Sequence, residues 1–149
     1  LSSDYCFVLT EGNPAGSRVP IRFKGGWKYG WCDASQAYFD SSDVVVARAG
    51  HGTIARAVTS SKPSLLVPIS NQTEQAGNAA KAAKLGVSIS IRQEGLNVES
   101  FRKAVEALRR EPYVSRAIRL GKIARSYDAR KTIVGLVEGA SMGKSPGQG

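Results

Sequence analysis

The chain has 149 residues, of which 42% are hydrophobic and 22% charged, and this composition suits one soluble globular domain with a sizeable core. Its formal net charge of +9 attracts phosphates, whether these belong to nucleotides, nucleic acid or anionic lipid. No apolar run approaches the roughly 18 residues of a membrane-spanning helix, and the two cysteines and one histidine have no metal-ligand spacing. We therefore expect a reduced, cytoplasmic protein, peripheral to a membrane at most, with no metal and no cofactor.

Strand-like and helix-like patterns alternate along the chain. Short apolar runs predict strands at residues 5–9, 19–23, 44–47, 65–69 and 87–91. Helical patterns fill the gaps, at residues 34–39, 54–60, 73–85, 98–110, 113–126 and 129–138. This alternation predicts an α/β fold with a Rossmann-like parallel sheet and helices on both faces. We expect one domain over residues 1–140 and a disordered Gly/Ser/Pro-rich tail over residues 141–149, the whole being a fragment of a larger protein.

A glycine-flanked loop follows the predicted strand at residues 44–47 and opens the next helix. It contains Arg48, Gly50, His51, Gly52 and Thr53. Its two glycines permit positive φ and close backbone approach, while the free N–H groups and the positive end of the helix attract an anion. A diphosphate fits such a loop, and a plain strand-to-helix turn is the alternative interpretation.

A second polar loop follows the predicted strand at residues 65–69. Asn71 and Glu74 have the spacing of a capping box, and Gln75 and Asn78 share one helix face. Both loops follow strands and precede helices, so both should lie at the carboxyl edge of the sheet, where ligands of open α/β folds bind. We expect residues 50–53, Gln75 and Asn78 to line one concave site.

Together these elements resemble the C-terminal domain of family 28 and related glycosyltransferases, which have two facing Rossmann-like domains, the GT-B fold. The family pattern is an acidic start to a strand, an Arg or His, Gly-x-x-Thr, Lys-Pro before the next strand and Gln-x-x-Asn-Ala. In this chain the matching elements are Asp43, Arg48, residues 50–53, Lys62-Pro63 and residues 75–79. A weaker resemblance extends over residues 5–138. The domain's first strand with its glycine-rich loop, and the whole N-terminal domain, have no counterpart.

The resemblance implies a binding role for each matching position. Residues 50–53 would lie against the diphosphate of a nucleoside diphosphate sugar, Gln75 would contact the sugar or phosphate, and Asn78 would support that loop. The turn at Trp31 and Cys32 is similar in position to the family segment that reads the base. Trp31 either stacks on the base or has a packing or surface role.

Arg56 is a departure from the family pattern, which usually has a Glu at this position to hold the ribose hydroxyls. At the third position of the predicted helix, a cation would oppose the helix dipole by about 0.3–1 kcal/mol. Arg56 would then pair with phosphate, pair with Glu74 or reach solvent.

The resemblance implies transfer of a hexosyl group from a nucleoside diphosphate sugar to an acceptor, and we expect the donor to be a UDP-sugar. The helix end would stabilise the departing diphosphate without a metal. We assign no catalytic base, because His51 suits a hydrogen bond to phosphate better than proton abstraction. The chain alone should be inactive and should depend on a missing N-terminal acceptor domain or a partner subunit. Two alternatives stay open, a non-catalytic donor-binding subunit and a UDP-sugar epimerase. An epimerase would need acid/base carboxylates, and these loops are poor in them.

Residues 92–131 carry eleven Lys/Arg among five Asp/Glu on helical patterns. The absence of interleaved aromatic residues disfavours a nucleic-acid-binding module. A solvated basic face, or contact with an anionic membrane or a lipid phosphate, remains open.

Overall fold

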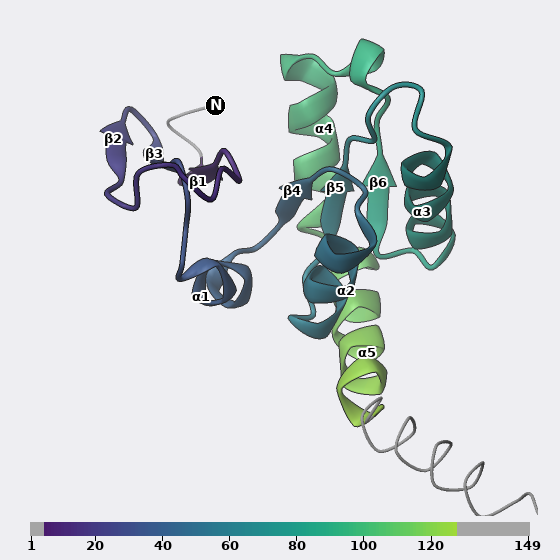
Figure 1. Cartoon of the computed structure of the whole chain (residues 1–149). Coiled ribbons are helices and arrows are strands. Elements are labelled where there is room, and N and C mark those ends of the chain that lie inside the picture. Colours follow the sequence, from purple (N-terminus) through teal and green to yellow (C-terminus); the bar gives the residue numbers. More distant parts are fainter. Residues whose placement is uncertain (1–4, 128–149) are drawn as a thin grey trace, which may run out of the picture.

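The computed structural model describes residues 5–127, which form two three-stranded sheets and their connecting helices (Figure 1). The strand orders are β1-β3-β2 and β4-β5-β6. The helix predicted at residues 129–138 and the tail predicted at residues 141–149 lie outside the described residues.

The second sheet is the parallel sheet that the sequence predicts. Its strands are β4 (Val45–Ala47), β5 (Ser64–Leu66) and β6 (Ser88–Ser90), all parallel. Successive side chains of a strand point to opposite faces, so Leu65 and Leu66, which are 0% and 1% exposed, enter different core clusters. The cluster of Leu65 includes residues of α4 (Val98–Leu108), and that of Leu66 includes residues of α3 (Thr73–Lys84). Helices on both faces confirm the predicted α/β fold.

The remaining helices of this half surround the sheet. α2 (His51–Thr59) packs against α5 (Tyr113–Ser126), whose bounds are those predicted from its periodicity. A short 3-10 turn, η1 (Gln93–Gly95), leads from β6 to α4. α4 starts at a capping box in which Ser100 N–H donates to Asn97 Oδ1 and Asn97 N–H donates to Ser100 Oγ, each at 2.9 Å. These polar bonds satisfy two of the free N–H groups at the helix start.

The first sheet departs from the prediction. Its strands are β1 (Phe7–Thr10), β2 (Ile21–Phe23) and β3 (Gly26–Tyr29); β3 pairs parallel with β1 and antiparallel with β2. We did not predict β3, because Gly-Trp-Lys-Tyr contains no apolar run. The expected burial of these strands is wrong: all of β2 is exposed. Figure 1 shows the sheet to the left of β4–β6, and α1 (Ser35–Ser41) connects it to β4. The ring of Phe7 on β1 lies 6.3 Å from that of Phe101 on α4, centroid to centroid.

β1 and β4 each end their sheet with a backbone edge that pairs with no strand in residues 5–127. Val8 on β1 is 39% exposed and Val46 on β4 is 47% exposed. Neither strand carries a proline or a charged residue, the devices by which soluble proteins usually protect an edge. The two strands therefore have the character of internal strands although they stand at edges.

None of the helices found in residues 5–127 is long and apolar enough to cross a bilayer.

Candidate functional site

The loop after β4 connects this strand to the start of α2 at the carboxyl edge of the sheet. Gly50 is the N-cap, with φ −70° and ψ 138°, and α2 begins at His51. We predicted the start at Thr53 or Ile54, because the apolar periodicity begins there, but the backbone becomes helical two or more residues earlier. No side chain caps α2 and no acidic residue lies in its first turn. Its first N–H groups and its positive dipole end are therefore available to an anion.

Gly50 and Gly52 do not use the positive φ that we expected of them, and their close approach to a ligand stays a prediction. None of Gly50, Gly52 and Gly77 has a positive φ, so backbone conformation does not require glycine there. A Cβ at any of the three would meet no atom within 4 Å, so packing does not require glycine either. A glycine inside a helix costs about 1 kcal/mol relative to alanine, and Gly52 and Gly77 lie inside α2 and α3. The fold itself gives no reason for this cost, whereas close approach of a ligand would.

The loop before α3 differs from the predicted capping box. Gln72 is the N-cap, no side chain caps the helix, and Asn71 adopts the left-handed conformation at φ 68°. The prediction for Asn71 and Glu74 is therefore wrong, because the left-handed residue shifts the helix start by one position. Gln75 holds the loop instead: its Oε1 accepts from Ile69 N–H at 3.1 Å and its Nε2 donates to Gln72 Oε1 at 2.6 Å.

Asn78 joins the two loops. Its Nδ2 donates to the carbonyl of Ala49 at 3.3 Å, and Ala49 is fully buried immediately before the N-cap of α2. Gln75 lies one turn before Asn78 on the same helix face. The structure thus brings the start of α2 beside the first turns of α3. That residues 50–53, Gln75 and Asn78 line one concave site stays a prediction.

Arg48 reaches across the carboxyl edge in another direction. Its Nη1 donates to the carbonyl of Val67 at 3.2 Å and to Gln93 Oε1 at 3.3 Å, so it bonds the segments that follow β5 and β6. Beside it, the hydroxyl of Ser70 donates to Glu94 and lowers the pKa of that carboxyl. Arg48 connects three carboxyl-edge segments, and its contact with a donor stays a prediction.

Within residues 5–127, Arg56 pairs with side chains of α1 and not with Glu74, and its pairing with a phosphate stays a prediction. Its Nη2 donates to Ser35 Oγ at 3.0 Å, its Nε donates to Gln36 Oε1 at 3.3 Å, and its guanidinium carbon lies 4.4 Å from the ring centroid of Phe39. All three partners belong to α1. Because α2 begins at His51 and ends at Thr59, Arg56 falls in its last turn, where a cation interacts favourably with the dipole. In this structure Arg56 therefore packs between α1 and α2.

The predicted base-reading turn lies between β3 and α1. Trp31 is half-buried; its Nε1 donates to Asp33 Oδ1 at 2.8 Å and its backbone N–H donates to Ser17 at 3.1 Å. Cys32 is buried, with 9% of its surface exposed. No hydrogen bond within residues 5–127 joins Trp31 or Cys32 to residues 50–53. Their contact with a base stays a prediction.

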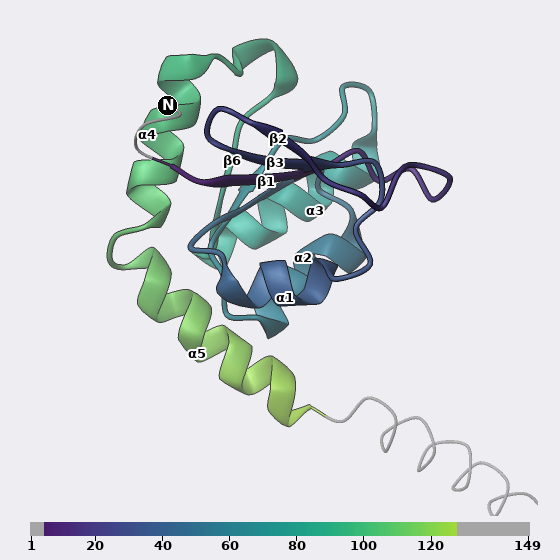
Figure 2. The same cartoon turned by 90° about the vertical axis from the view of Figure 1, so that its left-hand side faces the viewer.

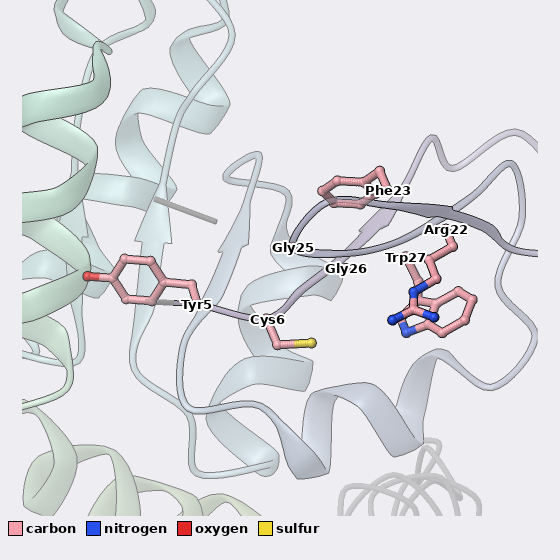
Figure 3. Close-up of a pocket in the computed structure, with 7 residues that line it drawn as sticks. All are labelled: Tyr5, Cys6, Arg22, Phe23, Gly25, Gly26 and Trp27. Carbon is pink, nitrogen blue, oxygen red and sulfur yellow. The ribbon is translucent and has the colours of Figure 1, made fainter. Parts of the chain in front are cut away.

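A hollow of about 250 Å³ lies on the first sheet, away from these loops (Figure 3). Arg22 covers the ring of Trp27, with its guanidinium carbon 5.5 Å from the ring centroid. The lining is Tyr5, Cys6, Arg22, Phe23, Gly25, Gly26 and Trp27, and none of these residues is a predicted donor contact. In the described part of the chain, no three His, Cys, Asp or Glu side chains gather closely enough to hold a metal ion.

Sequence reasoning missed two groups at the candidate site. The carbonyl of Ala49, which accepts from Asn78, has no sequence signal because it is a backbone atom. Gly77 did have one, since a glycine inside a helical pattern between two polar positions carries a cost that demands a reason.

Comparisons with known proteins identify the family of this domain. A family model described as the glycosyltransferase family 28 C-terminal domain matches residues 25–133. Two curated relatives share the name UDP-N-acetylglucosamine–N-acetylmuramyl-(pentapeptide) pyrophosphoryl-undecaprenol N-acetylglucosamine transferase. The one from Synechococcus sp. (strain WH7803) is 28% identical over 89% of this chain and 42% of its own length. The one from Phenylobacterium zucineum (strain HLK1) is 34% identical over 68% of this chain and 28% of its own length.

Solved structures share the fold. The glycosyltransferase of kitacinnamycin superposes with a TM-score of 0.79 at 22% identity, over 93% of this chain and 36% of that one. Glycosyltransferase VinC in complex with DTDP superposes with a TM-score of 0.68 at 22% identity, over 83% of this chain and 31% of that one. The chain therefore spans less than half the length of these relatives and structures.

Proposed function

Since this chain belongs to glycosyltransferase family 28, whose C-terminal domain it contains, we propose that it is the donor-binding half of an enzyme that transfers a hexosyl group from a UDP-sugar to an acceptor. The names of the curated relatives, which specify UDP-N-acetylglucosamine, support a UDP-linked donor. The sugar itself is left open by this proposal.

One observation carries the proposal. The uncapped start of α2 lies beside the first turns of α3 through the bond from Asn78 to Ala49, and glycines with no steric neighbours stand in both helices. Exposed N–H groups, a positive dipole end and room for close approach are the properties of a diphosphate site.

The proposed catalytic role of the α2 start depends on where negative charge develops during sugar transfer. As the bond between the sugar's anomeric carbon and the diphosphate oxygen breaks, negative charge grows on the diphosphate. The N–H groups of residues 51–53 are fixed in place before the reaction, so they stabilise that charge with little reorganisation. The proton of the acceptor hydroxyl needs a base, and we propose that this base comes from outside the chain, since His51, which is exposed at the helix start, would be a phosphate partner.

The second half of the enzyme would come from another segment or subunit. The limited share of each relative that this chain covers supports this view, as do the unprotected edges of β1 and β4, which have the character of internal strands. A chain that supplies only the donor site to a separate catalytic partner is the second form of the same proposal.

A calorimetric panel tests the proposal. We expect the chain to bind UDP and a UDP-sugar with similar affinity, UMP more weakly and uridine most weakly, because the helix start would read the phosphates. DTDP and GDP test the choice of base. Equal affinity for uridine and UDP, or binding of none of these compounds, would contradict the proposal.

A further inference from the structure

Glu94 is a charged side chain at the carboxyl edge that the proposed function does not use. It belongs to η1, the turn before α4, and it accepts a hydrogen bond from the hydroxyl of Ser70 in the β5–α3 loop (residues 67–72). Figures 1 and 2 show the turn before α4 and the β5–α3 loop at the same end of the molecule, at the top of both views. The bond therefore joins η1 to the loop that leads into Gln75.

η1 is held in place on both sides of Glu94. On one side, Gln93 Oε1 accepts from Arg48 Nη1 at 3.3 Å, and the same nitrogen donates to the carbonyl of Val67 in the β5–α3 loop at 3.2 Å. On the other side, Ser100 Oγ in the capping box of α4 donates to the carbonyl of the residue after Glu94 at 2.9 Å. Together with the bond from the loop to Glu94, the contacts of Arg48 form a closed ring. The carboxylate is therefore a fixed anchor for the loop.

The β5–α3 loop has few other contacts. Within residues 5–127, the side-chain hydrogen bonds of residues 69–72 go to Glu94 and Gln75 only. Residues 70–72 are exposed, and Asn71 has the left-handed backbone at φ 68°, a conformation that needs support from its surroundings. Loss of the bond to Glu94 would therefore loosen the loop.

The loop in turn fixes the orientation of the Gln75 amide. Because the N–H of Ile69 is a donor, the amide oxygen of Gln75 must face it, and the amide nitrogen then donates to Gln72. One N–H and one oxygen lone pair of the amide are left for a ligand. A loop that moves would carry these two groups out of line.

We propose that Glu94 is a positioning residue for donor binding, which acts through Ser70 and the β5–α3 loop on Gln75. This role rests on the proposed function, because Gln75 is the expected contact to the sugar or phosphate. The hydroxyl of Ser70 lowers the pKa of Glu94, so the carboxylate is charged in neutral solution and the bond is charge-assisted. Glu94 needs no contact with the donor for this role.

Calorimetry with the whole chain and UDP-N-acetylglucosamine tests the role of Glu94. Glu94→Ala and Ser70→Ala should each weaken binding about fivefold to tenfold, because the ligand must then order the loop, and the double variant should bind like either single variant. Glu94→Gln should recover most of the affinity, since its carbonyl oxygen still accepts from Ser70. Uridine affinity should be unchanged in all four variants.

Gln75→Ala tests whether Glu94 acts through Gln75. In a chain that already carries Gln75→Ala, Glu94→Ala should weaken binding by less than about twofold, because the side chain that the loop positions is gone. The matched control is Glu106→Ala, which removes the same charge from an exposed position of α4 and should leave binding unchanged. Circular dichroism checks that each variant is folded.

Two results would overturn the positioning role of Glu94: full affinity in folded Glu94→Ala, or an equal loss with and without Gln75. Either result would leave the proposed function standing, since the unmodified chain would still bind the donor. If neither UDP-N-acetylglucosamine nor UDP binds the unmodified chain, the proposed function fails, and the positioning role fails with it.

Discussion

At the scale of single residues, Gly52 is the most informative position of the candidate site. Replacing it with alanine should raise the free energy of unfolding by about 0.5–1 kcal/mol, because the helix favours alanine and the new Cβ meets no neighbour. The methyl group would stand where we propose the diphosphate approaches, so affinity for UDP should fall about tenfold, or 1.4 kcal/mol. Thermal unfolding and calorimetry measure the two effects, and uridine binding is the internal control. A Gly52→Ala variant with unchanged UDP affinity would argue against contact at this residue.

For Arg56 we expect a loss of stability with little change in affinity for UDP. Arg56→Ala removes two hydrogen bonds to α1 and the contact with Phe39, so it should lower the free energy of unfolding by about 1–2 kcal/mol. Affinity for UDP should change less than about twofold, because the side chain is turned toward α1. Chemical denaturation of Arg56→Ala, Phe39→Leu and the double variant measures their coupling. A large loss of UDP affinity with full stability would restore the phosphate role.

At the scale of elements, Asn78 couples α3 to the start of α2. Asn78→Ala removes the donor to Ala49, which should lower the free energy of unfolding by about 0.5–1.5 kcal/mol and weaken UDP binding through a less ordered loop. Asn78→Asp should weaken UDP binding further, because a carboxylate cannot donate to a carbonyl and would repel the diphosphate. Calorimetry on both variants measures which of them binds UDP more weakly. If Asn78→Asp binds UDP as well as the unmodified chain does, the two loops do not share the ligand.

The packing of α4 on the sheet depends on Leu108, which is fully buried in the cluster of Leu65. Leu108→Ala should lower the free energy of unfolding by about 2–5 kcal/mol, through lost apolar burial and a residual cavity. Leu85→Ala is the control, since Leu85 is 59% exposed and should cost much less. Similar losses in the two variants, measured by denaturant unfolding, would contradict this assignment of the core.

The sequence predicted well those elements whose periodicity reflects burial. The parallel sheet and α5 follow from apolar patterns, and the two polar loops were expected at one edge because both follow strands. Local backbone geometry was beyond such reasoning. The start of α2 lies before its first periodic residue, and this shift moves Arg56 out of the first turn, while the end of α2 at Thr59 places it in the last. The exposed strand β3 was missed because nothing buries it, and Asn71 is displaced from its predicted cap by a left-handed backbone.

At the scale of the whole molecule, the chain should bind a donor without turning it over. We expect no measurable hexosyl transfer by the purified chain with UDP-sugar and a lipid-linked acceptor, because the proposed base and acceptor site lie elsewhere. Adding the rest of the enzyme, as a longer chain or a second subunit, should produce transfer and should cover the exposed Val8 and Val46. Turnover is measured by chromatography of the UDP that is released. Transfer by this chain alone would contradict the division of labour that we propose.

The central claim is that the start of α2 holds the diphosphate of the donor, and backbone amide NMR during a titration with UDP tests it most directly. We expect the amide signals of His51, Gly52 and Thr53 to shift most, together with those around Asn78, because their N–H groups would gain charge-assisted hydrogen bonds. Uridine should leave the amide signals of residues 51–53 and of those around Asn78 nearly unchanged. If UDP instead shifts mainly the amides of the hollow between Tyr5 and Trp27, or leaves residues 51–53 unmoved at saturation, the diphosphate site is not at α2.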